Sequence, residues 1–347
     1  MPKKTNTFLI TNKSNIQYLS DFTGSNGFLL LTKNKTYLFT DSRYTQRAKT
    51  SIKKGIKVID MAKETLKDTL TKHKINSIGV EESDLTVTRY KRFKKLLGKI
   101  TLQDISGKIE KQREQKTKQE IDKTIKSQRI NEKVFKEIRK IVKEYQKSKN
   151  PLKRAPTEIE LAWKIKQLGN QYGANNVSFD PIVAFGQHSA IPHHAPDTTK
   201  LKKNDIVLID MGMKYQDYCS DMTRTLLPPK PTEKQKTIHA LVLKAQKHAI
   251  KHIKADITGK KADDLSRDII KDAGYGEFYT HSGGHGTGID IHEMPSLSAN
   301  YTKQIKENSI ITVEPGIYLN GEFGVRIEDM ILVTKKGNKN LTLQSHQ

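Results

Sequence analysis

Cysteine is nearly absent from this chain of 347 residues, and its single thiol, Cys219, excludes an intrachain disulfide. Long apolar runs are missing as well, because none approaches the roughly 20 residues that a membrane span needs. The start, MPKKTNTFLI, is basic but has no long apolar segment before a small-residue cleavage site, so we expect a cytoplasmic protein. Aromatic residues make up 7% and hydrophobic residues 35%, which is lean but sufficient for a core in a chain this long.

Acidic residues are also in short supply: 38 Asp and Glu stand against 62 Lys and Arg, a formal net charge of +24. Such a charge can mark a nucleic-acid-binding protein. Here the lysines are spread over the whole chain, and neither zinc-finger spacing nor a basic patch interleaved with aromatic residues accompanies them. We therefore interpret the charge as a solvated, lysine-rich surface, and we expect neither nucleic acid nor a membrane as a partner.

Two domains are expected, residues 1–112 and residues 113–347, because the composition changes near residues 110–115 from short alternating strands and helices to long charged helices. In the smaller α/β domain, Phe28–Leu31 and Tyr37–Thr40 flank a polar turn and predict a β-hairpin. The larger domain is expected to pack helices on a mainly antiparallel sheet, which is the α+β class.

The helices of the larger domain are marked by spacing and by a cap. Ile130, Val134 and Ile138 recur on one helical face. Thr157 is followed three residues later by Glu160, a capping box that predicts the start of the next helix.

Two aspartates lie in segments that are expected to pair as a hairpin, Ile206–Asp210 and Tyr218–Thr225. If the chain folds back midway between Asp210 and Asp221, these residues lie directly opposite each other, with Cβ atoms about 4.5–5.5 Å apart. Two carboxylates that close repel unless a cation lies between them or one of them keeps its proton. For an isolated pair, one exposed and one capping aspartate is the alternative.

A second acidic pair repeats this arrangement. Glu314 and Glu328 flank an Asn-Gly turn, and their midpoint is Gly321, which suits a three-residue hairpin loop with glycine at the positive-φ position. Two carboxylate pairs at hairpin-compatible spacing are much stronger evidence for a site than one.

Three histidines lie in the glycine-rich run HSGGHGTGIDIHE: His281, His285 and His292. A lone histidine is more often structural, but three in twelve residues, where glycines leave the backbone open to a ligand, favour a site. Two Asp, two Glu and one His form an oxygen-rich donor set with one imidazole. Such a set suits divalent Mn, Co, Fe or Zn and is unlike a structural thiolate zinc site.

Another histidine pair, His193 and His194, lies in the run AIPHHAP. A polar loop with prolines at both ends is one interpretation. The other is a histidine that donates a hydrogen bond to a substrate carbonyl or to a transition-state oxyanion.

Two further residues near the acidic pairs have simpler interpretations. Cys219 is expected to be a small buried thiol rather than a nucleophile. Arg224, in DMTRT, is expected to brace carboxylates rather than to bind substrate.

The runs IPHHAP, LIDMGMKYQDYCSDMTRT, SGGHGTGIDIHE, VEPGIY and GVRIEDM together resemble the motifs of the pita-bread metallopeptidases, and most closely those of the aminopeptidase P and prolidase branch. The opening run, NIQYLSDFTGSNGFLLL, with YLFTDSRY after it, is similar to the creatinase-type N-terminal domain of that branch. The resemblance therefore covers nearly the whole chain. It implies a creatinase-type domain over 1–112 and a pita-bread catalytic domain over 113–347.

The resemblance also implies roles for individual residues. The positions that match the ligands of two metal ions are Asp210, Asp221, His285, Glu314 and Glu328, with Asp221 and Glu328 expected to bridge or chelate. Glu314 also matches the general base.

Histidines and one arginine match positions around these ligands. His193 matches the histidine that steadies the substrate and the transition state, and His292 matches one near the scissile bond. His281 and Arg326 match positions behind the ligands or on the substrate side, and Arg326 is in addition a candidate partner for nearby carboxylates.

An Xaa-Pro aminopeptidase is the function that the resemblance implies, with peptides that carry proline at the second position as substrates. Prolidase, which cleaves Xaa-Pro dipeptides, is the alternative within the family. A relative of the fold that binds peptide or nucleic acid without catalysis is the alternative from another class. The implied cofactors are two divalent ions per subunit, Mn²⁺ ahead of Co²⁺, Zn²⁺ or Fe²⁺, and the implied assembly is a homodimer.

Overall fold

The chain divides into two compact units, Met1–Gln112 and Arg113–Gln347. The computed structural model describes residues 5–150, 152 and 154–343. Within this described part, no helix combines the length and the apolar character that crossing a membrane requires.

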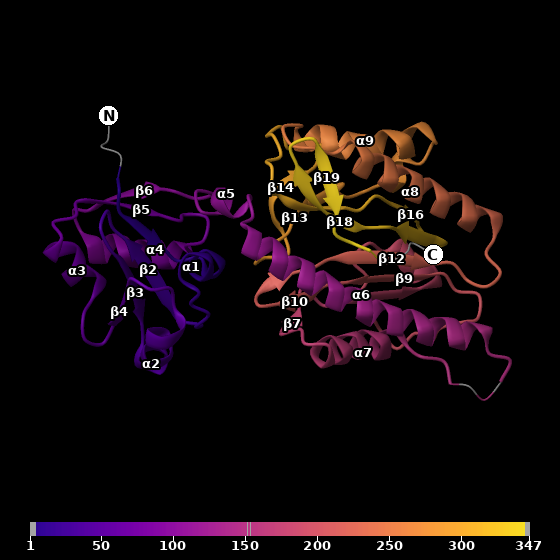
Figure 1. The fold of residues 1–347 in the computed structure, drawn as a ribbon, viewed down its shortest axis with the longest axis horizontal. Helices are drawn as coiled ribbons and strands as arrows, with labels where there is room; N and C mark the ends of the chain where they lie inside the picture. Colours follow the sequence, from indigo (N-terminus) through magenta and orange to yellow (C-terminus); the bar gives the residue numbers. More distant parts are fainter. Residues whose placement is uncertain (1–4, 151, 153, 344–347) are drawn as a thin grey trace. The chain divides into compact units, whose positions relative to one another are not determined.

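The smaller unit is a mixed sheet with helices against it (Figure 1). The strand order is β4-β3-β2-β1-β5-β6, with β2 and β3 antiparallel, which confirms the predicted hairpin. Its elements are β1 (Phe8–Ile10), α1 (Lys13–Ser20), β2 (Gly27–Leu31), β3 (Thr36–Thr40), α2 (Ser42–Ser51), β4 (Ile56–Asp60), α3 (Leu66–Lys72), β5 (Ser77–Val80), α4 (Val87–Leu97) and β6 (Thr101–Asp104). The short helix α5 (Glu110–Arg113) follows.

The larger unit places its strands between two pairs of helices (Figure 1). Its helices are α6 (Lys118–Lys147), α7 (Glu158–Gln171), η1 (Gly186–Ala190), α8 (Glu233–His252), α9 (Gly259–Asp272) and η2 (Gly276–Phe278). Its strands are β7 (Asn176–Val177), β8 (Ile182–Phe185), β9 (Val207–Met211), β10 (Met213–Tyr215), β11 (Tyr218–Cys219), β12 (Met222–Leu226), β13 (Gly284–Gly286), β14 (Glu293–Leu297), β15 (Ile310–Val313), β16 (Gly316–Leu319), β17 (Phe323–Arg326), β18 (Asp329–Thr334) and β19 (Gly337–Asn340).

Each helix pair covers its own set of strands. The apolar stripe of α6, which includes Val134 and Ile138, packs with α7 on β8, β9 and β12. The helices α8 and α9 pack on β15 to β18 instead. Burying one such aliphatic side chain stabilises the fold by about 1.5–3 kcal/mol, so these two layers hold the strands firmly between them.

One long hairpin runs from Ile310 to Thr334 and keeps a single register across two sheets. Strands β15 and β18 pair from Ile310 opposite Leu332 to Val313 opposite Asp329, and β16 and β17 continue from Gly316 opposite Arg326 to Leu319 opposite Phe323. The turn has Gly321 at its centre with a φ of 76°, as the sequence predicts. Glu314 and Glu328 therefore face each other at the break between the two strand pairs.

The other predicted register is wrong by two residues. Strands β9 and β12 pair Asp210 with Thr223, not with Asp221. The chain reverses at Gln216 and Asp217, whose φ values of 45° and 69° are those of a type I′ turn. Asp221 lies at the break between β11 and β12, two residues before the partner of Asp210.

Candidate metal centre

Three predicted ligands come together at the breaks in the strands. One donor atom each from Asp221, His285 and Glu328 lies within 4.8 Å of the others. His285 Nε2 lies 3.6 Å from Asp221 Oδ2 and 3.4 Å from Glu314 Oε1, so the fourth predicted ligand borders the same space. His285 Nδ1 donates to the Gly286 carbonyl at 3.1 Å, which leaves Nε2 with its lone pair toward the carboxylates.

Asp210, the fifth predicted ligand, is held by an arginine. Arg326 Nη2 donates to Asp210 Oδ2 at 2.7 Å, which confirms the expectation that Arg326 pairs with a nearby carboxylate. The other oxygen of Asp210, Oδ1, is buried and has no hydrogen-bond partner in the described part of the chain. A buried acceptor without a partner is costly unless something else, such as a cation, meets it.

The carboxylates are held in place by hydroxyl groups of neighbouring strands. Thr223 donates to Glu328 Oε2 at 2.7 Å, and Thr312 donates to Glu314 Oε1 at 3.2 Å. Thr312 Oγ1 also accepts from the backbone N–H of His285 at 3.0 Å. The threonines were not predicted as site residues, because their role follows from strand pairing and has no signal in the local sequence.

Negative charge exceeds positive charge at this point. Burial, followed by the charges of neighbouring carboxylates, raises the pKa of Asp221 and of Glu328 well above their usual range. Burial raises the pKa of Glu314 to about 7, although the Arg326 guanidinium opposes the rise. Four carboxylates face one buried guanidinium, and cations between them would relieve the repulsion.

The donor set therefore fits divalent metal ions. Carboxylate oxygens with one imidazole suit Mn²⁺, Co²⁺, Fe²⁺ or Zn²⁺. His285 Nε2 lies beside Asp221 and Glu314, and the charge of Asp210, whose Oδ1 is buried without a partner in the described residues, acts on Asp221, Glu314 and Glu328.

His281 and Arg326 belong to a hydrogen-bonded chain behind the cluster. Arg326 Nη1 donates to Tyr318 Oη at 2.7 Å, and Tyr318 donates to His281 Nε2 at 2.8 Å. Burial, followed by the charge of Arg326, lowers the pKa of His281 to about 3, so its imidazole is neutral and its Nδ1 donates to Ser282 O. The ring nitrogens of His281 and the guanidinium of Arg326 are thus bonded to groups within the fold.

His292 and His193 are both exposed and lie near the predicted ligands. The ring of His292 meets that of His285 edge to face, with 4.4 Å between centroids. His193 is exposed, and its charge is among the influences that lower the pKa of both His281 and His292, which places it near them. His194 is buried instead and points to Glu158.

The structure agrees with the expectations for Cys219 and Arg224. Cys219 is fully buried, and burial raises the pKa of its thiol to about 11. Arg224 is buried against Asp329 at 2.8 Å and also donates to the Glu328 carbonyl, so it braces the strand that carries Glu328.

Comparison with known proteins assigns the family. Residues 122–335 match the model of metallopeptidase family M24, and residues 3–115 match that of the creatinase/prolidase N-terminal domain. An uncharacterised peptidase of Bacillus subtilis is 35% identical over 337 residues, which cover 96% of this chain and 92% of that protein.

Two solved structures are similar to this chain in both sequence and fold. The Xaa-Pro dipeptidase from Bacillus anthracis is 34% identical with a TM-score of 0.92, over 99% of this chain and 94% of that one. The X-Pro aminopeptidase from Thermotoga maritima is also 34% identical, with a TM-score of 0.89 over 99% and 97% of the two chains. The pita-bread fold of the larger unit and the creatinase-like fold of the smaller one are thereby confirmed, and the chain is a hydrolase that belongs to metallopeptidase family M24.

Proposed function

We propose that this protein is an Xaa-Pro aminopeptidase, which hydrolyses the bond between an N-terminal residue and proline in a peptide. The observation that carries the proposal is the convergence of Asp221, His285, Glu314 and Glu328 beside an Asp210 oxygen that lacks a partner. Held by these five residues, two divalent ions, Mn²⁺ first among them, would polarise the scissile carbonyl and bring the pKa of a bound water near neutrality.

Glu314 is the proposed general base. Its side chain is 15% exposed, so it lies beside the buried ligand His285 and still reaches solvent. A carboxylate whose pKa is raised toward 7 takes a proton from water efficiently at neutral pH and can return it. The nitrogen of proline carries no N–H in the peptide, so this returned proton is what lets it leave as an amine.

His193 and His292 are proposed to act on the substrate. Both imidazoles are exposed beside the ligands, where a hydrogen bond to the developing oxyanion lowers the barrier. Arg326 and His281 are proposed to hold Asp210 and Tyr318 in place on the far side of the cluster.

Prolidase is the second candidate, and it is supported by the similar solved structures, more of which are named prolidase or dipeptidase than aminopeptidase. The test is hydrolysis of Ala-Pro, Ala-Pro-Ala and Ala-Ala-Ala by the full chain, with Mn²⁺ and after chelation. Metal-dependent cleavage of Ala-Pro-Ala supports the aminopeptidase, whereas cleavage of Ala-Pro alone supports the prolidase. Equal cleavage of Ala-Ala-Ala would contradict both, and Asp221→Ala serves as the inactive control.

We further propose that the protein is a homodimer and that it works in the cytoplasm. We place the boundary between its two domains between Gln112 and Arg113. The family resemblance supports the dimer, and the low cysteine content supports the compartment. Light scattering on the purified chain tests the dimer, because a monomer mass would contradict it.

A further inference from the structure

Glu158 is a fully buried carboxylate at the first position of α7. Its Oε1 accepts from the Phe185 backbone N–H at 2.8 Å and from His188 Nδ1 at 2.9 Å. Its Oε2 accepts from His194 Nε2 at 2.7 Å and from the Asp197 backbone N–H at 3.3 Å. Neither the mechanism nor the metal cluster accounts for this residue, and all four donors belong to the single segment 185–199.

Helix α7 holds the same segment with its backbone. The N–H groups of Glu158 and Ile159 donate to the carbonyls of Thr199 and Asp197, at 3.1 and 3.0 Å. The first N–H groups of a helix have no partner within the helix, so these bonds satisfy them. The first turn of α7 therefore binds this segment through backbone N–H groups and through the Glu158 side chain.

A second anchor lies at β17. The Gly324 N–H donates to Ser189 Oγ at 2.8 Å, and a Cβ at position 324 would lie 2.1 Å from the Ser189 carbonyl oxygen. Only glycine allows this approach of β17 to the segment.

His193 stands between two anchored neighbours. The carbonyl of Pro192 accepts from Arg326 Nη1 at 3.3 Å, and the same arginine holds Asp210. On the other side, His194 is bonded to the buried carboxylate. His193, the residue between them, is exposed and lies near His281 and His292, so its position follows from those of its neighbours.

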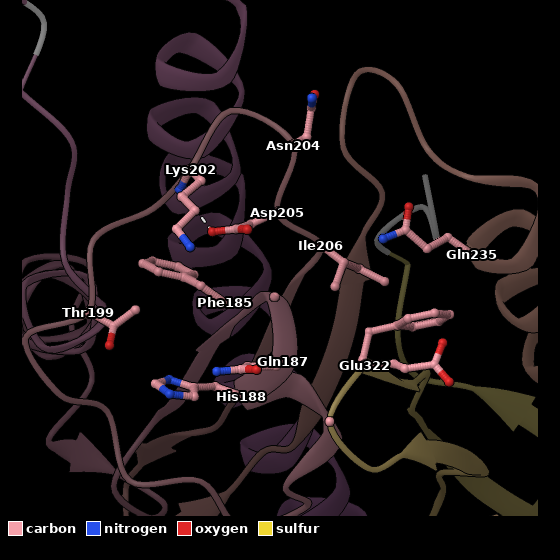
Figure 2. A pocket seen from close by; sticks show the side chains of 13 residues that line it. Phe185, Gln187, His188, Thr199, Lys202, Asn204, Asp205, Ile206, Gln235 and Glu322 are labelled. Atoms are coloured by element: carbon pink, nitrogen blue, oxygen red, sulfur yellow. Dashed lines mark hydrogen bonds between the residues drawn. The ribbon is translucent and has the colours of Figure 1, made fainter.

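A metal ion is the rival explanation for this cluster, because donor atoms of Glu158, His188, His194 and Asp197 lie within 4.8 Å of one another. Hydrogen bonds explain it better. A carboxylate has about four acceptor positions, and four donors already fill them. His188, whose side chain is 22% exposed, borders an open cavity of about 430 Å³ together with Gln187 (Figure 2), so part of its ring is open to solvent.

We propose that Glu158 is a positioning residue: through His188 and His194 it fixes the segment that presents His193 to the substrate. This proposal rests on the proposed function, since it assigns to His193 a role in the transition state. Displacing a catalytic group by about 1 Å can cost on the order of 10²-fold in rate.

The experiment is a double-mutant cycle on kcat with Ala-Pro-Ala. Glu158→Ala should lower kcat about 10²-fold with a smaller change in KM and an unchanged number of bound metal ions. In the His193→Ala background, Glu158→Ala should have almost no further effect, because the group that it positions is already gone. Glu158→Gln, which keeps one acceptor oxygen and the side-chain volume, should recover part of the rate.

Matched variants guard against a purely structural effect. Gln167→Ala removes an exposed polar side chain from the same helix, one that within the described residues bonds only Lys164 of that helix, and should leave kcat unchanged. His194→Phe fills the space but cannot donate, and it should reproduce the cycle if Glu158→Ala does not fold. Rate losses that multiply in the double variant would overturn the proposal, and so would the loss of one bound ion from Glu158→Ala.

Peptide cleavage by the wild type tests the proposed function, and hydrogen exchange tests the anchoring by Glu158 independently of it. If the wild type cleaves no Xaa-Pro peptide, the proposed function is wrong, and the anchoring is judged by hydrogen exchange alone. Glu158→Ala should then accelerate exchange across residues 186–199 and Gln167→Ala should not. Equal exchange in the wild type and Glu158→Ala would refute the anchoring.

Discussion

Removing the metal should make the stability of the larger unit fall as the pH rises from about 4.5 to about 7. Burial raises the pKa of Glu314 to about 7 in the folded chain, against an ordinary value of 4.5. The folded state therefore binds more protons than the unfolded state in this window, and stability decreases with pH. Below about pH 4.5 both states are protonated, and no penalty applies.

The gap between the two pKa values corresponds to about 3 kcal/mol for Glu314 alone. Asp221 and Glu328, whose pKa values are also raised, add to the fall. Bound metal should abolish most of it, because the cations stabilise the charged carboxylates that the metal-free fold disfavours.

The assay is urea unfolding of chelator-treated protein from about pH 5 to about pH 8. Trp163 is the single tryptophan and lies in α7, so its fluorescence reports on the larger unit alone. Glu314→Gln cannot ionise and should lose about 3 kcal/mol less than the wild type across this range. Glu322→Gln, an exposed control, should not differ from the wild type. If the free energy of unfolding fell equally with pH in the wild type and in Glu314→Gln, the reasoning would be refuted.

Three further predictions concern the residues around the site. Asp221→Ala and His285→Ala should each abolish peptide hydrolysis while the circular dichroism spectrum stays that of the wild type; near-normal rates would contradict the ligand assignment. Arg224→Met should lower the free energy of unfolding by about 3–5 kcal/mol, because Asp329 then keeps a buried charge without its main partner, and urea unfolding measures this. Cys219, with its pKa raised to about 11, should resist iodoacetamide at pH 8 until the chain unfolds, and rapid labelling of the native protein would disprove its burial.

Much of the larger unit could be predicted because its signals are local. The Asn-Gly turn determines where the chain reverses at Gly321, and so it predicts that Glu314 faces Glu328. The capping box at Thr157 likewise predicts the start of α7. In both cases the relevant residues lie within a few positions of the element that they determine.

Other features depend on contacts that the sequence does not reveal. The turn at Gln216 and Asp217 lacks the glycine that usually marks a type I′ turn, so the register of Asp210 was predicted two residues away from its true partner. The bonds of Glu158 reach residues 27 to 39 positions along the chain, and no local pattern announces them. The motif AIPHHAP marks His194 as a candidate, but the sequence does not show that Glu158 is its hydrogen-bond partner.

Because the hairpin from Ile310 to Thr334 keeps a single register, its turn determines which residues face each other at the candidate metal centre. A residue inserted or deleted between Leu319 and Phe323 would slide one strand past the other and separate the two glutamates that face each other at the break. In evolutionary terms, we expect the length of this exposed turn to vary little among relatives. We expect length changes to accumulate instead in loops outside the hairpin.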